Sequence, residues 1–155
     1  MPFQISGLPR TPFAPLFALD DEALKAQGAV RMIADAKPGF PCRISLADAE
    51  PGEELLLVNY EHQSAPTPFR ASHAVFVRKA AVEARPEPNE VPEALRTRAL
   101  SLRAFDAAGM MTDADLVEGG QAGVLIERMF SEPAVAYIHA HYAKRGCYAA
   151  RIDRA

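Results

Sequence analysis

Hydrophobic and polar residues alternate along much of this chain in short runs that are typical of β-strands. Side chains two positions apart share one face of a strand, so alternation predicts a sheet with one buried face. The uniform run Leu55–Val58 instead predicts a central strand buried on both faces. The expected strands are residues 3–8, 29–34, 42–46, 54–61, 73–78, 99–105 and 110–112, followed by a terminal β-hairpin that begins near residue 135.

Two or three short helices are expected between these strands. Asp20 can cap a helix that ends near Gln27, because Gly28 then takes the position after its last turn. A brief helix is expected at residues 93–98, and the apolar stripe within residues 120–131 predicts the clearest one. The predicted fold class is α+β: a mostly antiparallel, curved or barrel-like sheet with two or three short helices, ending in a β-hairpin.

Composition narrows the class of protein. The 155 residues fit a single domain, residues 1–155, with 49% hydrophobic and 24% charged residues. A net charge of −3 excludes an obvious nucleic-acid footprint, and no apolar stretch is long enough to cross a membrane. The first residues lack the features of a signal peptide, so we expect a cytoplasmic protein in which Cys42 and Cys147 are free thiols.

The terminal hairpin holds His139, His141 and Cys147, which are half of the chain's histidines and half of its cysteines. Its faces depend on the turn, because a slip of one residue turns every side chain over. A three-residue loop ending at Gly146 would place His139 opposite Arg151 and His141 opposite Ala149, with Cys147 on the same face. A four-residue loop would instead pair Tyr142 with Cys147. We favour the three-residue loop, because Gly146 can adopt the positive φ that it needs.

These residues predict a polar site on the hairpin. Arg151 would hold an anionic group, while His139 and His141 would act as catalytic proton donors or as ligands. Cys147 is a candidate nucleophile if a histidine activates it, although cysteine among alanines is also typical of a small buried residue. Further ligand-binding candidates come from other strands: Arg43, Tyr60, His62 and, where its face agrees, Arg103.

Two alternatives stay open within that site. A metal ion needs a third ligand beside His139 and His141, and no spacing selects one among His62, His73 and Cys147. The metal, and any cofactor, are therefore unknown. Arg151 could equally pair with a carboxylate such as those of Asp106 or Glu61.

Three sequence blocks resemble a known family: Lys37–Arg43, Leu55–His62 and His139–Arg151. They are similar to a bacterial family classed as a domain of unknown function, number 1203, over nearly the whole chain. The resemblance implies a small bacterial protein and a stand-alone domain. It implies no activity, cofactor or catalytic residue.

Two functions follow as alternatives. The first is a protein that binds a small anionic molecule, or an enzyme acting on one, through the His/Arg/Cys site of the hairpin. The second is a non-catalytic interaction module, for example a homodimer, with the histidines and Tyr137, Tyr142 and Tyr148 as its contact surface. A concave site would favour the first alternative, and a flat hairpin the second.

Overall fold

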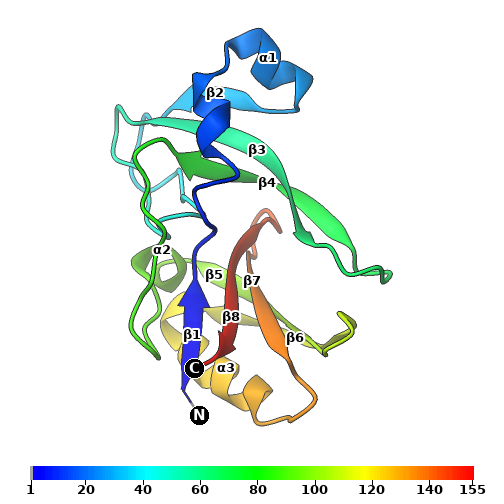
Figure 1. Cartoon of the computed structure of the whole chain (residues 1–155). Helices are drawn as coiled ribbons and strands as arrows, with labels where there is room; N and C mark the ends of the chain where they lie inside the picture. Colours follow the sequence, from blue (N-terminus) through cyan, green and yellow to red (C-terminus); the bar gives the residue numbers. More distant parts are fainter. Residues whose placement is uncertain (1) are drawn as a thin grey trace.

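The computed structural model describes residues 2–155 as two antiparallel sheets, the three-stranded one above the five-stranded one in Figure 1. The larger sheet has the order β1-β8-β7-β5-β6, and the smaller β2-β3-β4. The strands are β1 (Phe3–Ser6), β2 (Val30–Ile33), β3 (Glu54–Gln63), β4 (Ala71–Arg78), β5 (Ala99–Phe105), β6 (Met111–Glu118), β7 (Tyr137–Tyr142) and β8 (Tyr148–Arg154). The α+β class, the antiparallel pairing and the final hairpin are confirmed, with the expected curved sheet present as two sheets.

Three α-helices connect the strands: α1 (Asp21–Ala26), α2 (Glu93–Arg96) and α3 (Ala122–Phe130), with short 3-10 turns at Ala14–Ala18 and Gly119–Gln121. The Asp20 carboxylate accepts a hydrogen bond from the Ala23 amide, which caps α1 as predicted. No helix within residues 2–155 is long and apolar enough to cross a membrane.

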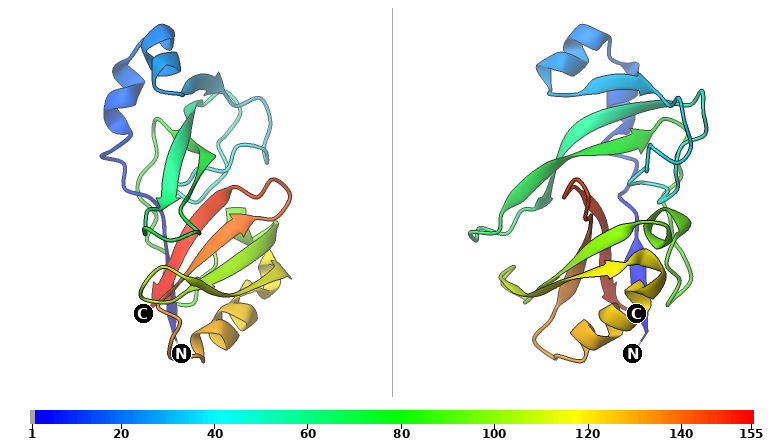
Figure 2. Two further views of the ribbon diagram at one scale, coloured as in Figure 1. Left: turned by 90° about the vertical axis from the view of Figure 1, so that its right-hand side faces the viewer. Right: turned by 180° about the vertical axis from the view of Figure 1, so that it is seen from behind.

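Two hydrophobic cores hold the sheets in place. On one face of the larger sheet, Ile126 and Phe130 of α3 pack with Ile138, Ala140 and Ile152 of the hairpin. The second core belongs to the smaller sheet and its neighbours, and Tyr148 of β8 is part of it. The hairpin tip therefore reaches from the larger sheet to the smaller one, as Figures 1 and 2 show. Its second face is turned toward β3 and β4.

The strand expected at residues 42–46 is wrong. This segment makes only isolated bridges, Pro41 to Asp48 and Cys42 to Phe76. The Leu46 amide donates to the Cys42 carbonyl at 3.0 Å, and Leu46 has a φ of 54°, so the backbone turns where alternation predicted an extended run. The short strand expected at residues 110–112 is longer, because β6 continues to Glu118.

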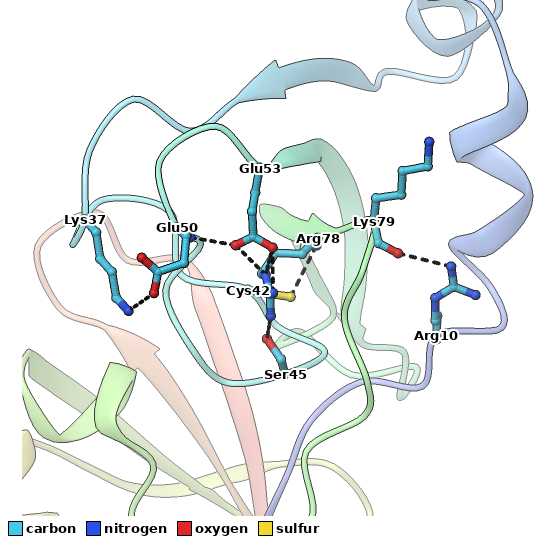
Figure 3. A network of polar contacts seen from close by, with 8 residues as sticks. All are labelled: Arg10, Lys37, Cys42, Ser45, Glu50, Glu53, Arg78 and Lys79. Carbon is cyan, nitrogen blue, oxygen red and sulfur yellow. Dashed lines mark hydrogen bonds and ion pairs between the residues drawn. The ribbon is translucent and has the colours of Figure 1, made fainter.

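A polar network fixes the 42–53 segment against β4 (Figure 3). The Arg78 guanidinium donates to the Glu53 carboxylate at 2.6 Å and to the Ser45 hydroxyl at 3.0 Å. The backbone N–H of Arg78 also donates to the Cys42 sulfur at 3.3 Å. Since Arg43 follows Cys42 directly, this network determines where the Arg43 side chain begins.

The hairpin register differs from the expected one at its tip. Tyr142 and Cys147 pair across the four-residue loop 143–146, since the Tyr142 amide donates to the Cys147 carbonyl at 2.9 Å. Gly146 has the expected positive φ of 77°. A β-bulge at Ala149 then absorbs one residue, so that His141 lies opposite Tyr148 while His139 still lies opposite Arg151. The three-residue loop is therefore wrong, and Cys147 lies on the face opposite to the histidines.

Candidate functional site

All four histidines of the chain lie together between the two sheets, although they come from three strands. The ring centres of His62 and His73 are 4.7 Å apart, and those of His62 and His141 are 5.0 Å apart. One ring nitrogen from each of His62, His139 and His141 lies within 4.8 Å of the other two. We call His62, His73, His139 and His141 the histidine cluster.

Strand geometry explains this convergence. His139 and His141 are two positions apart on β7, so they share the face that is turned toward the smaller sheet. His62 lies where the β3–β4 register shifts, between the pairs Glu61–Ser72 and Gln63–Ala71. Such a bulge redirects a side chain, and bulges are common beside functional sites. A second bulge at Ala149 brings Tyr148 opposite His141.

Hydrogen bonds orient the imidazole rings. His62 Nε2 lies 2.6 Å from His73 Nδ1, and His141 Nδ1 lies 2.9 Å from the Gly146 carbonyl oxygen. A carbonyl only accepts, so His141 Nδ1 carries the proton and its Nε2 has a free lone pair. The Nδ1 atoms of His62 and His139 are buried without a partner among residues 2–155. Buried polar atoms are rarely left unpaired, so these nitrogens indicate a missing partner.

Burial also fixes the charge of the rings. It lowers the pKa of His62 to about 4 and the pKa values of His139 and His141 to about 3. The neighbouring histidines and Arg103 lower these pKa values further by repulsion. The three imidazoles are therefore neutral at pH 7, and neutral imidazole is the form that binds metal ions.

Two other predicted residues border the cluster. The Tyr148 ring stacks on His62 with centres 5.1 Å apart, and Tyr60 packs on Tyr148 at 5.9 Å. Arg151 lies opposite His139, but its guanidinium covers the Tyr137 ring at 4.3 Å and pairs with Asp153 at 3.0 Å. The expected carboxylate partner of Arg151 is thus Asp153, in place of Asp106 or Glu61.

Arg103 faces the histidines and forms no ion pair with any of the described residues. It lies opposite His139 across the β5–β7 pair, and its only side-chain hydrogen bond within residues 2–155 goes to the Ser101 hydroxyl at 3.3 Å. Burial lowers the pKa of Arg103. Arg103 therefore takes the place that the sequence assigned to Arg151.

Arg43 and Cys147 lie on the other face of the hairpin, in a pocket of about 330 Å³. We call it the arginine pocket; it is lined by Gly39, Pro41, Arg43, Phe76, Arg98, Ala99, Tyr142, Lys144, Arg145 and Cys147. The Arg43 side chain donates to the Tyr148 carbonyl at 2.8 Å and to the Cys147 sulfur at 3.0 Å. The structure therefore separates Cys147 from the histidines with which the sequence grouped it.

Most of the residues expected to form a contact surface are buried, and only Tyr137 is half-buried. His139, His141 and Tyr148 are buried within the chain, and Tyr142 is 6% exposed. A homodimer stays a prediction, and the four buried side chains are not exposed to contribute to its interface.

A protein-family model matches residues 39–154, a range that includes the histidine cluster and the arginine pocket. The chain belongs to the DUF1203 family of proteins of unknown function. The resemblance seen in the sequence is therefore confirmed. No curated protein and no solved structure matches this DUF1203 chain.

Several residues of these sites were missed in the sequence. His73 was only one of three possible third metal ligands, and Lys144 and Arg145 were only residues of a turn. The scarcity of histidine was a usable signal, since only four are present and two of them flank the β3–β4 connection. Nothing in the sequence indicated that the Tyr142 ring would meet the guanidinium groups of Arg43 and Arg98, because the contact with Arg43 depends on the irregular 39–49 segment.

Proposed function

We propose that this DUF1203 protein binds a divalent transition-metal ion through His62, His139 and His141 and uses the ion to hold a small anionic molecule. The convergence of three ring nitrogens within 4.8 Å carries the proposal. Zinc bonds imidazole nitrogen at about 2.0–2.1 Å, which places tetrahedral ligand atoms about 3.3 Å apart. Small side-chain rotations would bring the three rings to that spacing.

The surroundings of the three rings support a metal centre. Metal-binding histidines usually donate their second ring N–H to a carbonyl or another acceptor, which fixes the tautomer. The Gly146 carbonyl does this for His141, and His73 does it for His62. An all-imidazole set suits zinc, copper, iron or nickel. Three protein ligands leave a coordination position open, as in catalytic zinc sites.

Charge favours an anionic molecule at that open position. Three neutral imidazoles leave the full charge of a divalent ion uncompensated. Arg103 adds a guanidinium on the same face, and guanidinium binds carboxylate or phosphate through paired hydrogen bonds. We further propose that the protein works in the bacterial cytoplasm, where Cys42 and Cys147 would stay reduced as free thiols.

Metal titration tests the first half of the proposal. Untagged protein, stripped with a chelator and dialysed, is titrated with Co²⁺, and the visible absorption of the bound ion is recorded. We expect saturation near one ion per chain, with loss of the band in His139→Ala/His141→Ala. Arg70→Ala is the control, since Arg70 is exposed and, within residues 2–155, forms an ion pair only with Glu61. No saturable band in the wild-type protein, or an unchanged band in the double variant, would contradict the metal centre.

An anion titration tests the second half. Sodium azide added to the Co²⁺-loaded protein should change the visible spectrum, because a small anion enters the open position. Arg103→Met should weaken this azide binding while the Co²⁺ affinity changes little, since Arg103 is not a ligand. Azide binding of equal strength in wild type and Arg103→Met would show that Arg103 does not take part in anion binding.

A further inference from the structure

The arginine pocket carries a second inference, independent of the metal centre. Arg43 is 2% exposed, and it is among the largest fully buried side chains of the chain. Within residues 2–155 its hydrogen bonds go to the carbonyls of Pro41 and Tyr148 and to the Cys147 thiol, and none goes to a carboxylate. A buried charge without a counterion is costly, and guanidinium does not lose its proton in proteins. Three bonds leave two of its five N–H groups free.

Tyr142 supplies a second unpaired group in the same pocket. Its hydroxyl is buried and has no hydrogen-bond partner among residues 2–155. The guanidinium carbons of Arg43 and Arg98 lie 5.0 and 5.2 Å from the centre of its ring. Burial raises the pKa of Tyr142 to about 12, so the hydroxyl stays protonated and can donate to an anion.

The charge of the pocket wall points to the same class of ligand. Arg98 is neutralised by Asp48 through two hydrogen bonds, of 2.6 and 2.9 Å. Lys144 and Arg145 are exposed on the hairpin loop and add positive charge at the pocket. A neighbouring smaller pocket of about 190 Å³ differs, because Asp48 and Glu93 accompany Lys37 in its lining. The arginine pocket thus carries an excess of positive charge that this smaller pocket lacks.

We propose that the arginine pocket binds a small molecule that carries an oxyanion group, held by Arg43 and the Tyr142 hydroxyl, with Lys144 and Arg145 attracting it from the hairpin loop. The oxyanion is a phosphate or a carboxylate, since both match the guanidinium donors. Phe76, Pro41 and the Tyr142 ring give the rest of the wall an apolar character. The ligand therefore has an apolar body beside its charged group, as in phenyl phosphate.

Cys147 offers a direct readout of occupancy. Its sulfur lies 3.0 Å from Arg43 Nη2 and lines the pocket, whereas Cys42 is completely buried elsewhere. In the metal-free protein, the rate of Cys147 alkylation by iodoacetamide is measured against increasing inorganic phosphate, benzoate or phenyl phosphate. We expect saturable protection at millimolar concentrations, with phenyl phosphate effective at a lower concentration than inorganic phosphate. Cys42 serves as the internal control that the protein stays folded.

Variants of exposed residues keep the test decisive. Arg43 variants are expected to disturb the fold, because Arg43 donates hydrogen bonds to two backbone carbonyls. The main variant is therefore Lys144→Ala/Arg145→Ala. It should raise the phenyl phosphate concentration needed for half protection about tenfold, since two favourable charges are removed. Tyr142→Phe should raise it as well, while His139→Ala/His141→Ala should leave it unchanged. Absence of protection by all three probes, or equal protection in every variant, would overturn the proposal.

Inorganic phosphate and benzoate separate the two sources of the oxyanion. Stronger protection by phosphate indicates a phosphorylated ligand, and stronger protection by benzoate a carboxylic acid; either result supports the pocket. These experiments use metal-free protein, so their results do not depend on whether the proposed metal centre exists.

Discussion

The histidine cluster and the arginine pocket lie on opposite faces of one hairpin, yet their chemistry is opposite. On one face, His139 and His141 meet His62 and His73 of the smaller sheet. On the other, Tyr142 and Cys147 meet Arg43 of the irregular 39–49 segment. Neighbouring residues of the same strands therefore serve two unlike sites.

Burial has different effects on the basic groups of the two sites. It removes the proton from an imidazole, whose ordinary pKa is near neutrality, and leaves a lone pair that suits a cation. It cannot remove the proton from a guanidinium, which stays charged and needs an anion or carbonyl oxygens. Burial alone thus gives the face of His139 and His141 an affinity for cations and the face of Arg43 an affinity for anions.

The largest effect is expected when two proposed ligands are removed from the metal site. In His139→Ala/His141→Ala we expect zinc affinity to fall by more than about 100-fold, since even outer-shell partners of a metal contribute 10–100-fold. Isothermal titration with Zn²⁺ measures this loss. Phenyl phosphate should protect Cys147 as well as in the wild type. Loss of both properties at once would show that the two faces are not independent.

Acid should affect the histidine face of the metal-free protein first. The pKa values of His62, His139 and His141 are lowered to about 4, 3 and 3, against an ordinary value of 6.5. Between pH 6.5 and these values the unfolded chain binds protons that the folded chain does not. Stability is therefore fully present above pH 6.5 and is lost as the pH falls, by up to about 1.4 kcal/mol per pH unit for each histidine.

Urea unfolding between about pH 7 and pH 5 checks this dependence, because most carboxylates titrate at lower pH. Arg103 faces the same rings and stays charged, so it keeps their pKa values low throughout the range. His139→Gln/His141→Gln should flatten the slope. An equal slope in wild type and variant would show that these histidines are protonated in the folded protein near neutrality.

Loosening the 42–53 segment should affect the arginine face alone. Arg78→Met leaves the half-buried Glu53 carboxylate without its guanidinium partner, so we expect a loss of about 2 kcal/mol in the free energy of unfolding. Cys147 protection should weaken, because Arg43 is no longer held against β4. Arg70→Ala removes an exposed ion pair and should change stability by less than about 1 kcal/mol. Weaker zinc binding in Arg78→Met would contradict this assignment.

His73 should matter less to the metal than the three proposed ligands. Its Nδ1 lies 2.6 Å from His62 Nε2, so it would act by orienting the His62 ring. His73→Gln is therefore expected to lower zinc affinity about tenfold, by loss of a partner that orients a ligand. A loss as large as that of the His139/His141 variant would make His73 a ligand itself.

The smallest effect should come from Tyr142→Phe in the ligand-free protein. The Tyr142 hydroxyl is buried without a partner among the described residues, so its removal should raise the free energy of unfolding by up to about 1 kcal/mol. Weaker oxyanion binding should accompany this gain. A destabilised Tyr142→Phe would indicate that the hydroxyl is already hydrogen-bonded in the free protein.

The sequence predicted local structure well and the convergence of distant segments poorly. The uniform apolar run located β3, alternation located β5 and the terminal hairpin, and the cap at Asp20 located α1, because these features depend on nearby residues. The bulges at His62 and Ala149 leave no local signal, and each shifts the register by one residue. From the sequence we therefore predicted that Cys147 lies with the histidines and that Arg151 is the free cation beside them, a position that Arg103 occupies in the structure.

We propose that the histidine face binds a metal ion and that the arginine face does not. Elemental mass spectrometry of untagged protein, purified without chelators and reloaded with Zn²⁺ where needed, tests it most directly. We predict about one ion per chain in the wild type and in Lys144→Ala/Arg145→Ala, and none in His139→Ala/His141→Ala. A wild-type protein that takes up no metal after reloading, or a histidine variant that keeps it, would contradict the account.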